Sequence, residues 1–109
     1  MEKICNNDEL HKFNDANSDK MTVIKFSGSW CQPCKQLSKV IADIEGDFID
    51  KVAFCECEVD DADESFVEQF NVVNIPMMIF FRNGLLIDKV VGMIGRDKLI
   101  NKINENLSK

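Results

Sequence analysis

The chain has 109 residues, of which 45% are hydrophobic and 29% are charged. This length suits one compact domain, because a second domain would be too small to stabilise itself, and we therefore expect a single domain over residues 1–109. The formal net charge of -6 disfavours nucleic acid and anionic membrane surfaces as partners. The polar N-terminus does not look like a signal peptide and no apolar run approaches the length of a membrane span, which predicts a cytoplasmic protein.

The first half of the chain alternates between strand and helix patterns. Lys3 to Cys5 predicts a short edge strand, and Asn7 or Asp8 can cap the helix that follows. The β-branched segment from Thr22 to Ser27 predicts the first central strand. A long helix is then predicted from the cysteines to around Gly46 to Phe48. Its apolar stripe is formed by Leu37, Ile41, Ile44 and Phe48.

The second half of the chain predicts three further strands and two helices. Val52 to Val59 has the pattern of a strand, and Glu64 to Phe70 that of a short helix. Met77 to Phe81 and Leu85 to Val91 predict a hairpin that turns at Arg82-Asn83-Gly84. The closing helix is marked by Leu99, Ile100, Ile103 and Leu107. Helical crossovers make the early strands parallel and the hairpin antiparallel, so we expect an α/β fold with a central mixed β-sheet flanked by helices on both faces.

The motif Trp30-Cys31-Gln32-Pro33-Cys34 points to thiol chemistry. Two thiols separated by two residues can close a disulfide without moving the rest of the fold. The motif lies where a predicted strand passes into a helix, and the unpaired N–H groups of a helix N-terminus favour a thiolate. We therefore predict Cys31, at the exposed start of the helix, as the nucleophile and the more buried Cys34 as the resolving thiol.

A zinc site is the main structural alternative for such a motif, and the rest of the sequence argues against it. His11 is the only histidine, no second C-x-x-C exists, and Cys55-x-Cys57 has the alternating pattern of a strand. We expect no metal site. Cys55 and Cys57 should share one face of their strand, opposite to Glu56, and serve as small buried hydrophobes that turnover does not need.

Over nearly its whole length the chain resembles the thioredoxin family. The matching features are a strand ending in Phe26, Trp30-Cys31-x-Pro33-Cys34-Lys35, an Asp60 that ends the third strand, Ile75-Pro76 before an apolar strand, Asn83-Gly84 at the hairpin and Val91-Gly92 before the last helix. The resemblance implies a thioredoxin fold in which the Ile75-Pro76 peptide bond is cis and lies against the cysteines. It also implies a shallow apolar groove for substrates around Cys31, lined by Trp30, Ile75, Pro76, Gly92 and Met93.

The sequence departs from the family pattern near the dithiol. Gln32 replaces the usual glycine, Ser27-Gly28-Ser29 replaces a stretch that normally carries a second tryptophan and an alanine, and Met77 replaces a common threonine. We expect Gln32, Pro33 and Pro76 to tune the reduction potential.

A second departure concerns two charged residues. Lys25 stands where thioredoxins usually bury an aspartate, and Glu56 where they usually place a lysine. Strand neighbours of opposite charge offset one another's desolvation, so the two are predicted to form a charge-swapped, buried or half-buried ion pair that tunes the cysteines.

The resemblance implies a protein-disulfide reductase of the thioredoxin type, a monomeric electron carrier in cell redox homeostasis. It would bind no cofactor itself and would be recharged by a thioredoxin reductase that uses flavin and NADPH. Its other partners would be proteins that contain disulfides. Two alternatives stay open: a more oxidising, isomerase-like oxidoreductase, and a binding module or subunit whose dithiol is incidental.

Overall fold

The computed structural model describes all residues from 1 to 109. It consists of five strands, four α-helices and one 3₁₀ turn. In chain order these are β1 (Glu2–Lys3), α1 (Asn7–Ala16), β2 (Met21–Ser27), α2 (Gln32–Ile44), the 3₁₀ turn η1 (Glu45–Phe48), β3 (Val52–Glu58), α3 (Glu64–Gln69), β4 (Met77–Arg82), β5 (Leu85–Val91) and α4 (Arg96–Leu107).

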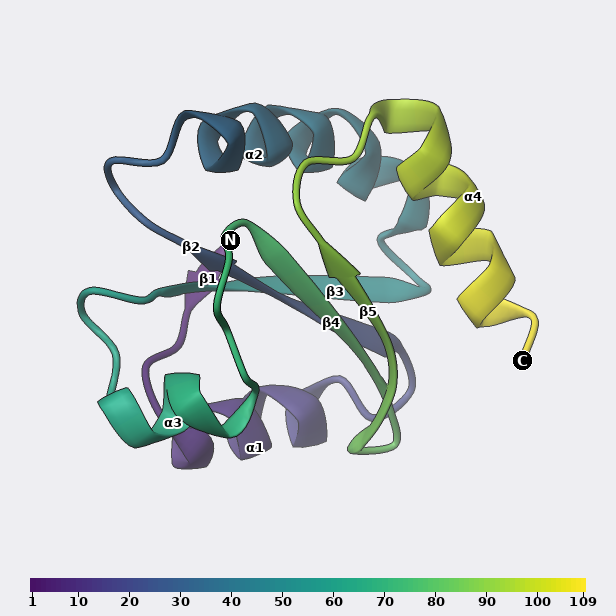
Figure 1. The fold of residues 1–109 in the computed structure, drawn as a ribbon. Helices are drawn as coiled ribbons and strands as arrows, with labels where there is room; N and C mark the ends of the chain where they lie inside the picture. Colours follow the sequence, from purple (N-terminus) through teal and green to yellow (C-terminus); the bar gives the residue numbers. More distant parts are fainter.

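The strands form one mixed sheet in the order β1-β3-β2-β4-β5. β1, β3 and β2 are parallel, whereas β4 is antiparallel to β2 and β5 is antiparallel to β4. Helices α2 and α4 cover one face of the sheet, and α1 and α3 cover the other (Figure 1). This arrangement confirms the predicted α/β fold. None of the helices has both the length and the apolar character needed to cross a membrane.

Near the N-terminus the boundaries differ from those predicted. The edge strand is Glu2–Lys3 rather than Lys3 to Cys5, because the Cys5 N–H donates to Glu9 Oε1 instead of extending the sheet. The helix cap is Asn6, not Asn7 or Asp8: its side chain accepts the Glu9 N–H at 2.9 Å. Glu9 therefore closes the helix start with two bonds, its N–H donating to the Asn6 side chain and its carboxylate accepting from Cys5, much as in a capping box.

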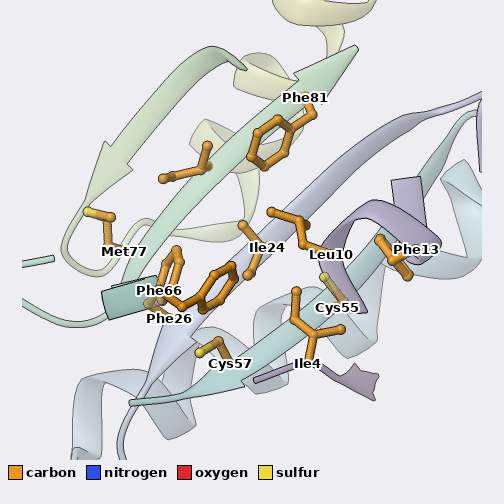
Figure 2. Packing of buried hydrophobic residues seen from close by; sticks show 11 residues of the cluster. Ile4, Leu10, Phe13, Ile24, Phe26, Cys55, Cys57, Phe66, Met77 and Phe81 are labelled. Carbon is orange, nitrogen blue, oxygen red and sulfur yellow. The ribbon is translucent and has the colours of Figure 1, made fainter. Parts of the chain in front are cut away.

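Two apolar layers lie on opposite faces of the sheet. Figure 2 shows the layer under α1 and α3, which contains Ile4, Leu10, Phe13, Ile24, Phe26, Cys55, Cys57, Phe66, Met77, Ile79 and Phe81. The layer under α2 and α4 contains Met21, Val23, Leu37, Ile41, Ile44, Val52, Phe54, Met78, Phe80, Leu99 and Ile103. Because both faces are covered, all seven residues of the central strand β2 are buried.

The strand alternation places the charged and thiol residues of β3 on different faces. Cys55 and Cys57 lie in the layer under α1 and α3, as predicted (Figure 2). Glu56, between them, is paired with Lys25 of β2 in the register of the sheet. Side chains two apart share a face of a strand, so the Lys25 and Glu56 side chains meet on the side covered by α2.

Candidate active site

Cys31 and Cys34 form a disulfide at the N-terminus of α2, with their Cα atoms 5.3 Å apart. Cys31 is the N-cap residue of this helix, and its Sγ accepts the Cys34 N–H at 3.2 Å. Pro33, whose missing N–H costs nothing in the first turn, continues the helix. When the disulfide is reduced, the same N–H and the positive end of the helix dipole favour a thiolate on Cys31.

Cys31, the predicted nucleophile, is less exposed than the sequence predicts. Cys31 is only 5% exposed and Cys34 1%. The Cys31 sulfur is bonded to Cys34 and lies 3.9 Å from the Ile75 carbonyl oxygen, so little of it reaches the surface. The exposed residues of the motif are Trp30, Gln32 and Pro33. Cys31 nevertheless remains the more accessible of the two sulfur-bearing residues.

The segment before β4 lies against the dithiol. The Ile75-Pro76 peptide bond is cis, as the family resemblance implies. The Pro76 carbonyl accepts the Gly92 N–H at 2.7 Å, which brings the end of β5 alongside. Met93 follows and is 41% exposed. Neither the N–H nor the carbonyl of Ile75 takes part in a backbone hydrogen bond.

An apolar hollow of about 230 Å³ opens beside this segment. It is lined by Trp30, Val59, Val67, Val72, Val73 and Ile75. Of the five residues predicted to line a groove, only Trp30 and Ile75 border this hollow; Pro76, Gly92 and Met93 do not. Val59 directly follows β3, Val67 lies in α3, and Val72 and Val73 lie in the loop after α3. No sequence pattern placed them together.

Trp30 is held over the site by a hydrogen bond. Its Nε1–H donates to Asp60 Oδ2 at 3.1 Å, although 68% of the side chain is exposed. Asp60 follows β3, whose end is joined to β2 where the Val59 N–H donates to the Ser27 carbonyl at 2.9 Å. The sequence indicated Asp60 only as a matching family position and gave no contact for it.

A buried polar cluster lies on the α2 side of the sheet. Lys25 is 1% exposed, and its Nζ forms an ion pair with Glu56 Oε2 at 2.9 Å. Nζ also donates to Ser27 Oγ at 3.2 Å and to Ser38 Oγ at 2.5 Å. An ammonium has three N–H groups, and each has an acceptor here, as a buried charge requires. The predicted ion pair is therefore present.

The two serines of this cluster were not predicted as site residues. Ser38 follows Cys34 by four residues in α2, so both lie on the same face of the helix. That spacing is a signal which the sequence offered, because a serine one turn after Cys34 lies on the same face of the helix. Through Ser38 the Lys25 ammonium is joined to the helix that carries the dithiol.

The two cysteines of β3 lie in a different environment. Burial in the apolar layer raises the pKa of Cys57 to about 12, and it raises the pKa of Cys55 further. Nearby acidic groups add to both shifts. A thiol with such a pKa stays protonated near neutral pH and is not a nucleophile. No three His, Cys, Asp or Glu side chains gather closely enough to hold a metal ion.

Comparisons with known proteins agree with this geometry. The sequence model of the Thioredoxin family matches residues 3–105. A thioredoxin from Chlamydia caviae is 34% identical over 94 residues, covering 86% of this chain and 90% of that protein. Thioredoxin H5 of Arabidopsis thaliana is 36% identical over 99 residues, covering 90% and 78%.

A solved structure shows the same fold. The thioredoxin of Fasciola hepatica superposes with a TM-score of 0.86 over 96% of this chain and 98% of its own, at 23% identity. The disulfide at the start of α2, the matched family and the shared fold lead to one conclusion. This chain belongs to the thioredoxin family, and Cys31 and Cys34 are the redox-active pair of a protein-disulfide oxidoreductase.

Proposed function

We propose that this protein is a cytoplasmic electron carrier, a monomer with a single domain over residues 1–109, that uses Cys31 to attack disulfides in other proteins and Cys34 to resolve the intermediate. The observation that carries the proposal is the place of the Cys31 sulfur. It caps α2, accepts the Cys34 N–H and belongs to the more exposed residue of the pair.

The reaction balances over two exchange steps. The Cys31 thiolate attacks one sulfur of the substrate disulfide, so that a mixed disulfide forms and the other substrate sulfur leaves as a thiolate. Cys34 then loses its proton and attacks the Cys31 sulfur, which releases the second substrate thiolate and leaves the Cys31–Cys34 disulfide. Two electrons pass to the substrate, whose sulfurs take up two protons.

The oxidised pair must regain two electrons before another turnover. A thioredoxin reductase that passes electrons from NADPH through a flavin would supply them, as the family membership suggests. Its dithiol would attack the same Cys31–Cys34 bond. The chain itself would need no bound cofactor, because both redox states of the pair are formed by its own sulfurs.

Protein substrates would lie across Trp30, Ile75 and the end of β5. The unpaired N–H and carbonyl of Ile75 can form hydrogen bonds with an extended peptide, as in strand addition. Apolar side chains of that peptide would enter the valine-lined hollow. Pro76, Gly92 and Met93 would contact the peptide on the other side of Ile75.

The polar cluster around Lys25 would tune the reduction potential of the Cys31–Cys34 pair. The Lys25 ammonium, bonded to Ser38 one turn after Cys34, favours a negative charge on the Cys34 sulfur. A charged lysine cannot accept the Cys34 proton, so that proton would leave through water or through Glu56, whose side chain is 13% exposed. Gln32, Pro33 and Pro76 would adjust the potential from the exposed side.

The same cluster favours a second candidate function. Stabilising a thiolate stabilises the reduced pair, which makes an oxidoreductase more oxidising. A buried ammonium beneath the resolving thiol therefore supports the more oxidising, isomerase-like alternative. The potential measured against glutathione separates the two: a value near that of disulfide isomerases would favour isomerisation over reduction.

The decisive experiment is insulin disulfide reduction coupled to NADPH consumption through a thioredoxin reductase. We expect turnover by the wild type and none by Cys31→Ser. If the reduced protein, prepared chemically, also left insulin disulfides intact, protein-disulfide reduction would not be its function. A Cys31→Ser, Cys34→Ser double variant that kept full biological activity would instead indicate a binding module.

A further inference from the structure

Gly28 lies where the loop that carries the dithiol meets the segment before β4. It is buried, and its carbonyl accepts the Cys31 N–H at 3.2 Å. The glycines with positive φ are Gly84 and Gly92, so Gly28 has a backbone conformation open to other residues. The backbone conformation therefore gives no reason for a glycine at this position.

The reason lies in the space around its Cα. A Cβ added to Gly28 would stand 2.9 Å from Ile75 Cδ1, closer than real Cβ atoms approach. It would also lie 3.1 Å from Trp30 Cε2 and 3.3 Å from Trp30 Cζ2. Two side chains from distant parts of the sequence thus come together over the place that a β-carbon would occupy.

Both of these side chains border the apolar hollow beside Cys31. Trp30 is directed by its hydrogen bond to Asp60, and the Ile75 carbonyl lies against the Cys31 sulfur. A residue larger than glycine would push the indole and the Ile75 side chain outward. It would leave the bonds of the dithiol and the cap of α2 in place.

We infer that Gly28 is a specificity-determining positioning residue, which seats Trp30 and Ile75 together as the wall of the hollow nearest Cys31. This inference rests on the proposed use of that hollow by protein substrates. Gly28 itself does not touch the substrate, and it acts through the two side chains that pack over it.

Gly28→Ala tests the inference without removing any contact group. The two contacts are with the end of an isoleucine side chain and the edge of an exposed indole, which can both move, so the fold is expected to persist. Gly46→Ala is the matched control: a Cβ there meets nothing within 4 Å, and its φ is not positive.

The first measurement uses the fluorescence of Trp30, the only tryptophan. We expect Gly28→Ala to change its emission and its quenching by acrylamide, because the indole shifts and its bond to Asp60 weakens. Gly46→Ala should match the wild type. An unchanged Trp30 signal in Gly28→Ala would overturn the inference.

The second measurement compares two substrates of the chemically reduced protein in single turnovers. The rate constant for insulin should fall about tenfold in Gly28→Ala, the lower end of the effect of one misplaced methyl group in an apolar site. The rate constant for hydroxyethyl disulfide, which is too small to span the hollow, should stay within about twofold of the wild type. Equal losses for both substrates, or no loss for insulin, would contradict the inference.

The test of Gly28 can be told apart from the test of the proposed function. Failure of the wild type with insulin would refute the proposed function, while Trp30 quenching would still decide the positioning role. Should Gly28→Ala fail to fold, the double variant with Ile75→Val removes Cδ1 and the shortest contact. Failure of that variant as well would show that Gly28 supports the fold and not specificity.

Discussion

The cysteines on the two faces of the sheet have different surroundings. Under α1 and α3, Cys55 and Cys57 lie among aliphatic and aromatic side chains, and burial raises their pKa values. Under α2, Cys34 is just as buried, yet a lysine, a glutamate and two serines lie on the same side of the sheet. We expect the polar groups around a buried thiol, and not its burial alone, to decide whether it reacts.

Of the experiments that test this contrast, thiol labelling should show the largest effect. At pH 7 a thiol with a pKa of about 12 is ionised to about one part in 10⁵, while an ordinary exposed thiol is ionised to a few per cent. In the reduced protein, iodoacetamide should label Cys31 at least about a thousandfold faster than Cys57 or Cys55, as followed by mass spectrometry. Rapid labelling of Cys55 or Cys57 would indicate a regulatory pair instead.

Trapping should separate the two cysteines of the motif. Cys34→Ser should accumulate mixed disulfides with substrate proteins, because Cys31 attacks and nothing resolves the product. Cys31→Ser should trap none and lose at least about a thousandfold in turnover, as expected when a nucleophile is removed. Cys57→Ala should keep its activity and serves as the control. Equal trapping by both serine variants would make the assigned order of attack wrong.

The polar cluster can be broken by one substitution. Glu56→Gln leaves a buried ammonium without its carboxylate and should lower the free energy of unfolding by about 3 kcal/mol. Lys25→Met should slow the resolving step and make the pair more reducing, because the positive charge near Cys34 is lost. Chemical denaturation and the pH profile of insulin reduction measure both effects.

A surface pair provides the control for that experiment. Lys102 and Asp88 are 3.3 Å apart, with side chains 33% and 20% exposed. Lys102→Met should cost less than about 1 kcal/mol, as is usual for exposed ion pairs, and leave the pH profile unchanged. If Lys25→Met and Glu56→Gln each cost less than about 0.5 kcal/mol and also leave the profile in place, the coupled pair does not tune the cysteines.

The buried thiols of β3 should affect stability at alkaline pH. A folded-state pKa of about 12, raised from 9.0, means that Cys57 ionises in the unfolded chain first. The contribution of Cys57 to the free energy of unfolding is therefore fully present below pH 9. It is lost as the pH rises toward 12, at up to about 1.4 kcal/mol per pH unit. The chain has no tyrosine to titrate in this range. Cys57→Ala should reduce the loss of unfolding free energy between pH 9 and 12. An unchanged slope of this free energy against pH would contradict this account.

Features that depend on the spacing of residues within one helix or strand could be predicted from the sequence. Strand alternation placed Cys55 and Cys57 away from Glu56, and the strand-to-helix setting placed Cys31 at the start of a helix. The ion pair of Lys25 and Glu56 followed from their positions within two strands. Each of these depends on spacing along one element or on the register of neighbouring strands.

Features that depend on packing between distant segments could not be predicted. The hollow is formed by valines that share no periodicity, and the burial of Cys31 depends on how closely the Ile75 carbonyl approaches. The cap at Asn6 was missed because two asparagines and an aspartate in succession all suit that position. Only the hydrogen bond from the Glu9 N–H to the Asn6 side chain identifies the cap.

The three acceptors around the Lys25 ammonium also join separate elements of the fold. Ser27 belongs to β2, Ser38 to α2 and Glu56 to β3, so one ammonium ties the catalytic helix to two neighbouring strands. Every turnover breaks and remakes a covalent bond at the tip of that helix. With its second turn anchored in this way, we expect α2 to keep its position in both redox states, so that any rearrangement is confined to the residues at its N-terminus.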